Sequence, residues 1–82
     1  AQNYPNPFNP STTITFGLTV QQEVTLEVFD YTGRLVSTLL QGVQTAGSYE
    51  VPFDASSLAS GMYLYRLKTQ NGVFHNKMLL IK

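Results

Sequence analysis

Apolar and polar residues alternate along most of this 82-residue chain, and this period of two limits the fold more than any other feature. Successive side chains of a β-strand point to opposite faces of a sheet, so the alternation predicts half-buried strands. No stretch shows a sustained helical period. The pattern predicts strands at residues 12–18, 23–28, 34–40 and 48–53.

Two further strands are predicted near the end of the chain. The segment Leu58–Leu67 begins as a turn at Ser60-Gly61 and continues as a strand with large side chains on both faces. Such a strand is usually central in its sheet. Asn71-Gly72 favours a two-residue type I′ turn, after which Val73–Ile81 forms the last strand.

Six to seven short strands at a spacing of roughly ten residues predict an all-β fold, an immunoglobulin-like antiparallel β-sandwich. Pro52 cannot donate to a ladder, so its strand is expected at an edge. Tyr63, near the start of a late strand, is the candidate for the tyrosine corner of such sandwiches. Residues 1–11 hold three of the four prolines and predict an extended lead-in from an upstream linker, and residues 12–82 are expected to form the single domain.

The charge balance argues against two classes of partner. Five Lys and Arg residues balance five Asp and Glu residues, which provides no long-range attraction to nucleic acid or to an anionic membrane. No window approaches the ~18 consecutive apolar residues of a membrane span. We therefore expect no nucleic-acid binding and no membrane insertion.

The sequence also offers little chemistry. There is no Cys, and the single histidine, His75, has no partner for a transition-metal site. Ser11, His75 and Asp54 can be written as a nucleophilic triad, but no motif supports that assignment. We expect no cofactor, no metal site, no catalytic residue and no enzymatic activity.

The predicted last hairpin has two distinct faces. With Asn71-Gly72 as the loop, one face pairs Tyr65 with Met78 and Tyr63 with Leu80, and it is expected to be buried. The other face pairs Leu64 with Leu79 and Met62 with Ile81. It also places Arg66 opposite Lys77, which requires either good solvation or an acidic neighbour.

The apolar residues of the second face, Met62, Leu64, Leu79 and Ile81, have two interpretations. Exposed, they form a contact patch that also allows weak self-association through the C-terminal hairpin. Alternatively, another segment covers them, such as the one that carries Tyr4 and Phe8, or a bulge shifts the register of the hairpin.

Four segments carry a family resemblance: Asn3–Ile14 (NYPNPFNPSTTI), Val28–Val36 (VFDYTGRLV), Leu58–Leu67 (LASGMYLYRL) and Lys77–Lys82 (KMLLIK). As an ordered set they are distributed along almost the whole chain, from Asn3 to Lys82. The set resembles the C-terminal type A sorting domains of the type IX secretion system, and it is also similar to the immunoglobulin-like domain of flagellar hook-capping proteins.

The resemblance implies a non-catalytic C-terminal signal of a larger exported bacterial protein. The partners would be the secretion machinery and the covalently linked upstream cargo. The domain would pass through the periplasm, and the cargo would end at the cell surface or outside the cell. By match to the family motifs, the machinery would recognise eight residues: Gly61, Tyr63, Lys77, Met78, Leu79, Leu80, Ile81 and Lys82.

Two alternatives remain. The domain could be a permanent immunoglobulin-like spacer or adhesion module of an extracellular enzyme. It could also be a carbohydrate-binding sandwich in which outward aromatic residues such as Phe29 and Tyr31 form a stacking platform.

Overall fold

The computed structural model of the chain describes residues 2–4 and 10–81. Within them the chain forms seven strands: β1 (Gln2–Tyr4), β2 (Ser11–Leu18), β3 (Gln22–Asp30), β4 (Leu35–Gln44), β5 (Gly47–Asp54), β6 (Gly61–Thr69) and β7 (Gly72–Leu80). This described part contains no helix that could cross a membrane.

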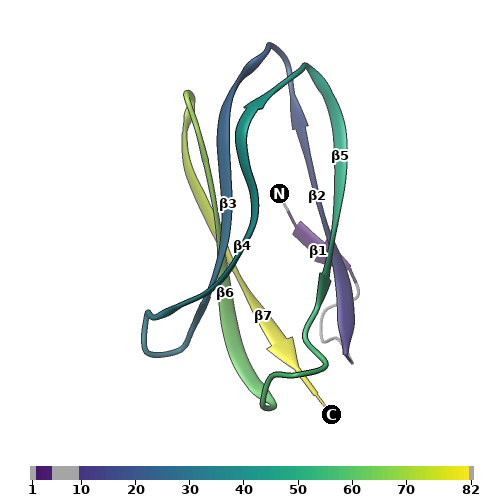
Figure 1. Cartoon of the computed structure of the whole chain (residues 1–82), viewed down its shortest axis with the longest axis vertical. Helices are drawn as coiled ribbons and strands as arrows, with labels where there is room; N and C mark the ends of the chain where they lie inside the picture. Colours follow the sequence, from purple (N-terminus) through teal and green to yellow (C-terminus); the bar gives the residue numbers. More distant parts are fainter. Residues whose placement is uncertain (1, 5–9, 82) are drawn as a thin grey trace.

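The strands form two antiparallel sheets that pack face to face (Figure 1). One sheet has the order β1-β2-β5 and the other has the order β4-β3-β6-β7. This confirms the predicted all-β, immunoglobulin-like sandwich. It also confirms the interior place of β6 and the edge place of β5, in which Pro52 lies opposite Thr13.

The core lies between the sheets and takes every second residue of the strands that line it. On β3, Val24, Leu26 and Val28 are all 0% exposed. Ile14 on β2 and Tyr65 on β6 are equally buried. Because full burial of a Val or Leu side chain contributes about 1.5–3 kcal/mol, these alternating positions supply much of the driving force for folding.

Strand β4 differs from its prediction because it contains two irregularities. Leu26 lies opposite Leu40 and Glu27 lies opposite Thr38, which leaves Leu39 as an extra residue. A second register shift between Val28 and Phe29 makes Val36 another extra residue. These bulges explain why apolar alternation is blurred there. The strand also continues to Gln44, beyond the predicted end at residue 40.

The register of the last hairpin differs by two residues from the prediction. Thr69 pairs with Gly72, so Gln70-Asn71 and not Asn71-Gly72 forms the loop. A type I′ turn needs positive φ at both loop residues, and no described non-glycine residue has positive φ. The Gln70 amide also donates a 3.1 Å hydrogen bond to Oε1 of the buried Gln22. This contact with β3 stabilises the observed loop.

The corrected register changes the partners of side chains but not their faces, because it shifts the pairing by two residues. Tyr63 lies opposite Met78, Met62 opposite Leu79, and Leu64 opposite Lys77. Arg66 lies opposite His75. The predicted repulsion between Arg66 and Lys77 as direct neighbours is therefore wrong.

The N-terminal segment contributes a short strand. Strand β1 pairs with β2, with Gln2 opposite Thr15 and Tyr4 opposite Thr13. The sheet therefore begins before the boundary predicted at residue 12, and the division into a lead-in and a sandwich stays a prediction. The predicted anchor Phe8 lies outside the described residues.

Candidate recognition surface

An apolar stripe follows the outer face of β6 and the end of β7. We call it the β6–β7 patch and define it as Met62, Leu64 and Leu79 together with Ile81, which lies one residue beyond the end of β7. Met62 is 43% exposed, Leu79 36% and Ile81 48%, while Leu64 is half-buried. Solvent-exposed apolar clusters of this kind mark contact surfaces on small monomeric domains. The patch is therefore accessible, as the contact-surface interpretation requires.

The structure divides the predicted recognition residues into two groups. Met78, Leu80 and Tyr63 point into the core and are 0%, 1% and 8% exposed. Lys77, Leu79 and Ile81 point outward and are exposed. Lys82 lies outside the described residues. Only the outward group is available to a partner that meets the folded domain.

Gly61 and Tyr63 hold the start of β6 in place. Gly61 has a φ of +149°, in a region that residues with a Cβ rarely adopt, and it lies opposite Leu80. The Tyr63 hydroxyl donates a 2.7 Å hydrogen bond to the Ala59 carbonyl, which confirms the predicted tyrosine corner. Both residues position the strand that carries Met62 and Leu64.

The β3–β4 turn forms a wall beside the patch. Tyr31, in the turn, is 84% exposed, and with Gly33, Met62 and Lys77 it lines a mostly apolar hollow of about 250 Å³. The sequence predicts strands on either side of this turn but not the hollow, because nothing local in the sequence shows that the turn folds over β6.

Asp30 builds this turn through its side chain. Its Oδ1 accepts hydrogen bonds from the Thr32 hydroxyl, the Thr32 amide and the Arg34 amide. The Thr32 hydroxyl in particular holds the pKa of Asp30 below its ordinary value of 3.8. Burial opposes this, and the Arg34 and Thr32 amides and the charge of Arg34 lower the pKa further. The carboxylate is therefore the form that the turn stabilises.

Arg66 lies on the same outer face but is already partnered. Its guanidinium is 2.8 Å from Glu27 Oε1 and 4.8 Å above the centroid of the Phe29 ring. From the sequence, Arg66 was expected to need either good solvation or an acidic neighbour, and Glu27 is that acidic neighbour. Because Arg66 covers Phe29, Tyr31 is the exposed member of the aromatic pair considered for carbohydrate stacking.

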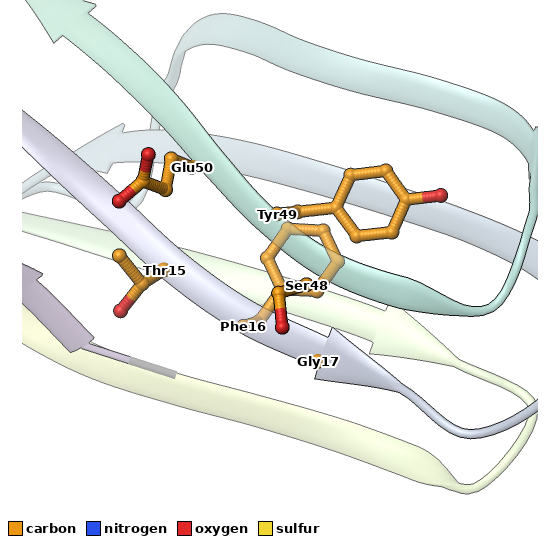
Figure 2. A pocket seen from close by; sticks show the side chains of 6 residues that line it. All are labelled: Thr15, Phe16, Gly17, Ser48, Tyr49 and Glu50. Atoms are coloured by element: carbon orange, nitrogen blue, oxygen red, sulfur yellow. The ribbon is translucent and has the colours of Figure 1, made fainter.

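A second hollow lies on the other sheet, between β2 and β5 (Figure 2). The Phe16 and Tyr49 rings stack there at 5.1 Å between centroids, and Tyr49 donates a hydrogen bond to the Thr45 carbonyl. Of the described residues that line this hollow, Glu50 alone carries a charge. It offers no set of acid, base or nucleophile.

The structure does not assemble the other residues considered for chemistry. Ser11 and Asp54 lie opposite each other on β2 and β5, whereas His75 lies on β7 in the other sheet. Among residues 2–4 and 10–81, no group of three His, Asp or Glu side chains could hold a metal ion.

These features define the class of protein: an immunoglobulin-like sandwich domain with a tyrosine corner and an exposed apolar stripe beside its last strand. Residues 2–82 match the family model described as the secretion system C-terminal sorting domain. The chain belongs to that family, which confirms the resemblance seen in the sequence motifs. It is a secretion sorting domain, and its family membership implies export toward the cell surface or the extracellular space.

Two solved structures share the fold. The first is dimeric latent PorU from Porphyromonas gingivalis, with a TM-score of 0.72 and 24% identity over 98% of this chain. The second is PorZ of the same organism, a surface component of its type IX secretion system, with a TM-score of 0.67 and 24% identity over 99% of this chain. The chain spans only 9% and 11% of those proteins. A search of curated proteins gave no match.

Proposed function

We propose that this domain is a non-catalytic sorting signal whose outer β6–β7 face is recognised by the type IX secretion machinery. The machinery would carry the attached cargo from the periplasm across the outer membrane for surface attachment or release. The observation that carries the proposal is the exposed β6–β7 patch, which includes Leu79 and Ile81 of the Lys77–Lys82 segment that resembles the family's terminal motif.

The two groups of predicted recognition residues take different roles in this proposal. Leu79 and Ile81 contact the machinery, together with the exposed Lys77 beside them. Tyr63, Met78 and Leu80 act from within the core by fixing the strand, and Gly61 does so through its backbone. Lys82 is part of the proposed contact on the strength of the family motif.

Surface substitutions test this more sharply than deletion of residues 77–82, because deletion also removes the buried Met78 and Leu80. In the full-length cargo protein, Leu79→Asp and Ile81→Asp should leave the protein in the periplasm. Val43→Asp is the matched control, because Val43 is 62% exposed on β4, at the other edge of the same sheet. Normal surface delivery of both patch variants would refute the proposal.

The alternative, a permanent extracellular module, is supported by the core of buried residues that both sheets of the domain contribute to. The two proposals differ in the fate of the domain: a sorting signal of this family is removed when the cargo is attached or released, whereas a permanent module stays on the protein. Intact-mass measurement of the mature secreted protein distinguishes them, because a permanent module retains these residues.

A further inference from the structure

Phe74 on β7 lies on the core-facing side of its sheet but is not covered. It is directly opposite Leu67, which is 4% exposed, and directly opposed residues of an antiparallel pair share a face. Phe74 is nevertheless 50% exposed. The described part of the opposite sheet therefore ends before it reaches this ring.

The exposed ring of Phe74 lies beside the C-terminal part of β2. Strand β1 pairs with Thr13 to Thr15 only. Strand β2 continues to Leu18, and its other edge is paired with β5 over that whole length. Among the described residues, the β1 side of Phe16, Gly17 and Leu18 has no neighbouring strand.

A hollow of about 190 Å³ marks this corner of the sandwich. Phe16, Leu18, Leu67 and Phe74 form its apolar part, and Gly17, Thr19, Gln22, Thr69 and Asn71 line the rest. Its volume exceeds the ~30 Å³ share of one water several times, so it has room for an apolar side chain. Phe16 and Leu18 are themselves buried and point inward. A strand added beside them would place every second side chain over the hollow.

The register of β1 specifies which segment would lie there. Gln2 lies opposite Thr15, and the pairing is antiparallel. If this register continues upstream, the residue immediately before Ala1 lies opposite Gly17. The second residue before Ala1 then lies opposite Leu18. The residue opposite Leu18 shares its inward face, and it would close the gap over Phe74.

We propose that the polypeptide immediately upstream of this domain continues β1 along β2 as far as Leu18, with an apolar side chain at the second position before Ala1. This rests on the proposed function, in which cargo precedes the sorting domain. The last residues of the cargo linker are then part of the folded signal.

A disulfide trap tests the register in the full-length protein. The chain has no Cys, Gly17 faces outward, and a Cβ at Gly17 would meet only the Gly47 oxygen at 3.9 Å. Cysteine at the position before Ala1, combined with Gly17→Cys, should form a disulfide on mild oxidation with oxidised glutathione. The same upstream cysteine combined with Ser48→Cys is the matched control, because Ser48 lies on the far side of β2.

Hydrogen exchange gives a second readout without cysteines. Proline at the second position before Ala1 should make the peptide that contains Phe16–Leu18 exchange about tenfold faster, whereas proline eight residues before Ala1 should not. Unchanged exchange, or equal cross-linking of Gly17→Cys and Ser48→Cys, would overturn the proposed strand. Surface delivery of the same variants reports separately on sorting, so failure of the strand leaves the proposed function standing.

Discussion

The hydroxyl of Tyr63 donates a 2.7 Å hydrogen bond to the carbonyl of Ala59, four residues upstream. This bond ties β6 to the connection that leads from the other sheet. Tyr63→Phe removes it and leaves the ring in the core, so we expect a loss of about 1 kcal/mol in the free energy of unfolding. For a domain of this size, that corresponds to a fall of about 4–8 °C in Tm, which calorimetry can measure.

Tyr65 provides the comparison for this variant. Its hydroxyl is buried without a hydrogen-bond partner in the described structure, and Asn76 on β7 lies opposite Tyr65. Tyr65→Phe removes a buried, unsatisfied group, so the free energy of unfolding should stay unchanged or rise. Equal losses for both variants would contradict a specific role for the Tyr63–Ala59 bond.

Gly61 tests the difference between a backbone requirement and a recognition role. A Cβ there would meet nothing within 4 Å, so the cost of Gly61→Ala comes from its φ of +149° alone. We expect a loss of about 1–2 kcal/mol in urea unfolding. Gly17→Ala is the control because Gly17 has no positive φ, and it should be neutral or stabilising by about 0.4–1 kcal/mol.

Local patterns were sufficient to predict six of the seven strands of the described residues, because burial of one face imposes a period of two on the sequence. Strand β1 fell within the predicted lead-in. Val24, Leu26 and Val28 show this directly. Pro52 also revealed its edge position through chemistry that is local to the residue. The tyrosine corner followed in the same way from the position of Tyr63 beside the Ser60-Gly61 turn.

The hairpin register could not be predicted in this way. Asn71-Gly72 has a strong local preference, but the contact of Gln70 with Gln22 crosses 48 residues of sequence. The exposure of Phe74 likewise depends on a distant feature, the length of β1 in the other sheet. Alternation was sufficient to predict that Met78 points inward and Leu79 outward. The hollow beside Tyr31 could not be predicted, because it depends on how the β3–β4 turn folds.

The Arg66–Glu27 ion pair should contribute measurably to stability because it is partly shielded from water. Glu27 is only 17% exposed and Arg66 36%, and the guanidinium also stacks on Phe29. A double-mutant cycle with Arg66→Met and Glu27→Gln should give a coupling energy of about 1 kcal/mol. The Arg34–Asp30 pair is the control, because Arg34 is 83% exposed and its coupling should be near zero. Equal coupling in the two cycles would contradict this role of burial.

Acid should destabilise the domain through two turn carboxylates. The Thr32 hydroxyl lowers the pKa of Asp30, and the Ser56 amide lowers that of Asp54, each from an ordinary value of 3.8. A carboxyl whose pKa is lower in the folded state stabilises the fold above its unfolded pKa, and this contribution is lost as the pH falls through the folded value. The free energy of unfolding should therefore decline as the pH falls below about 4. Asp30→Asn with Asp54→Asn keeps the side-chain carbonyls as acceptors but removes both titrations, so urea unfolding from pH 7 to pH 2 should show a shallower decline. If the free energy of unfolding declines equally at low pH in the native chain and the double variant, these two turns are not the cause of the decline.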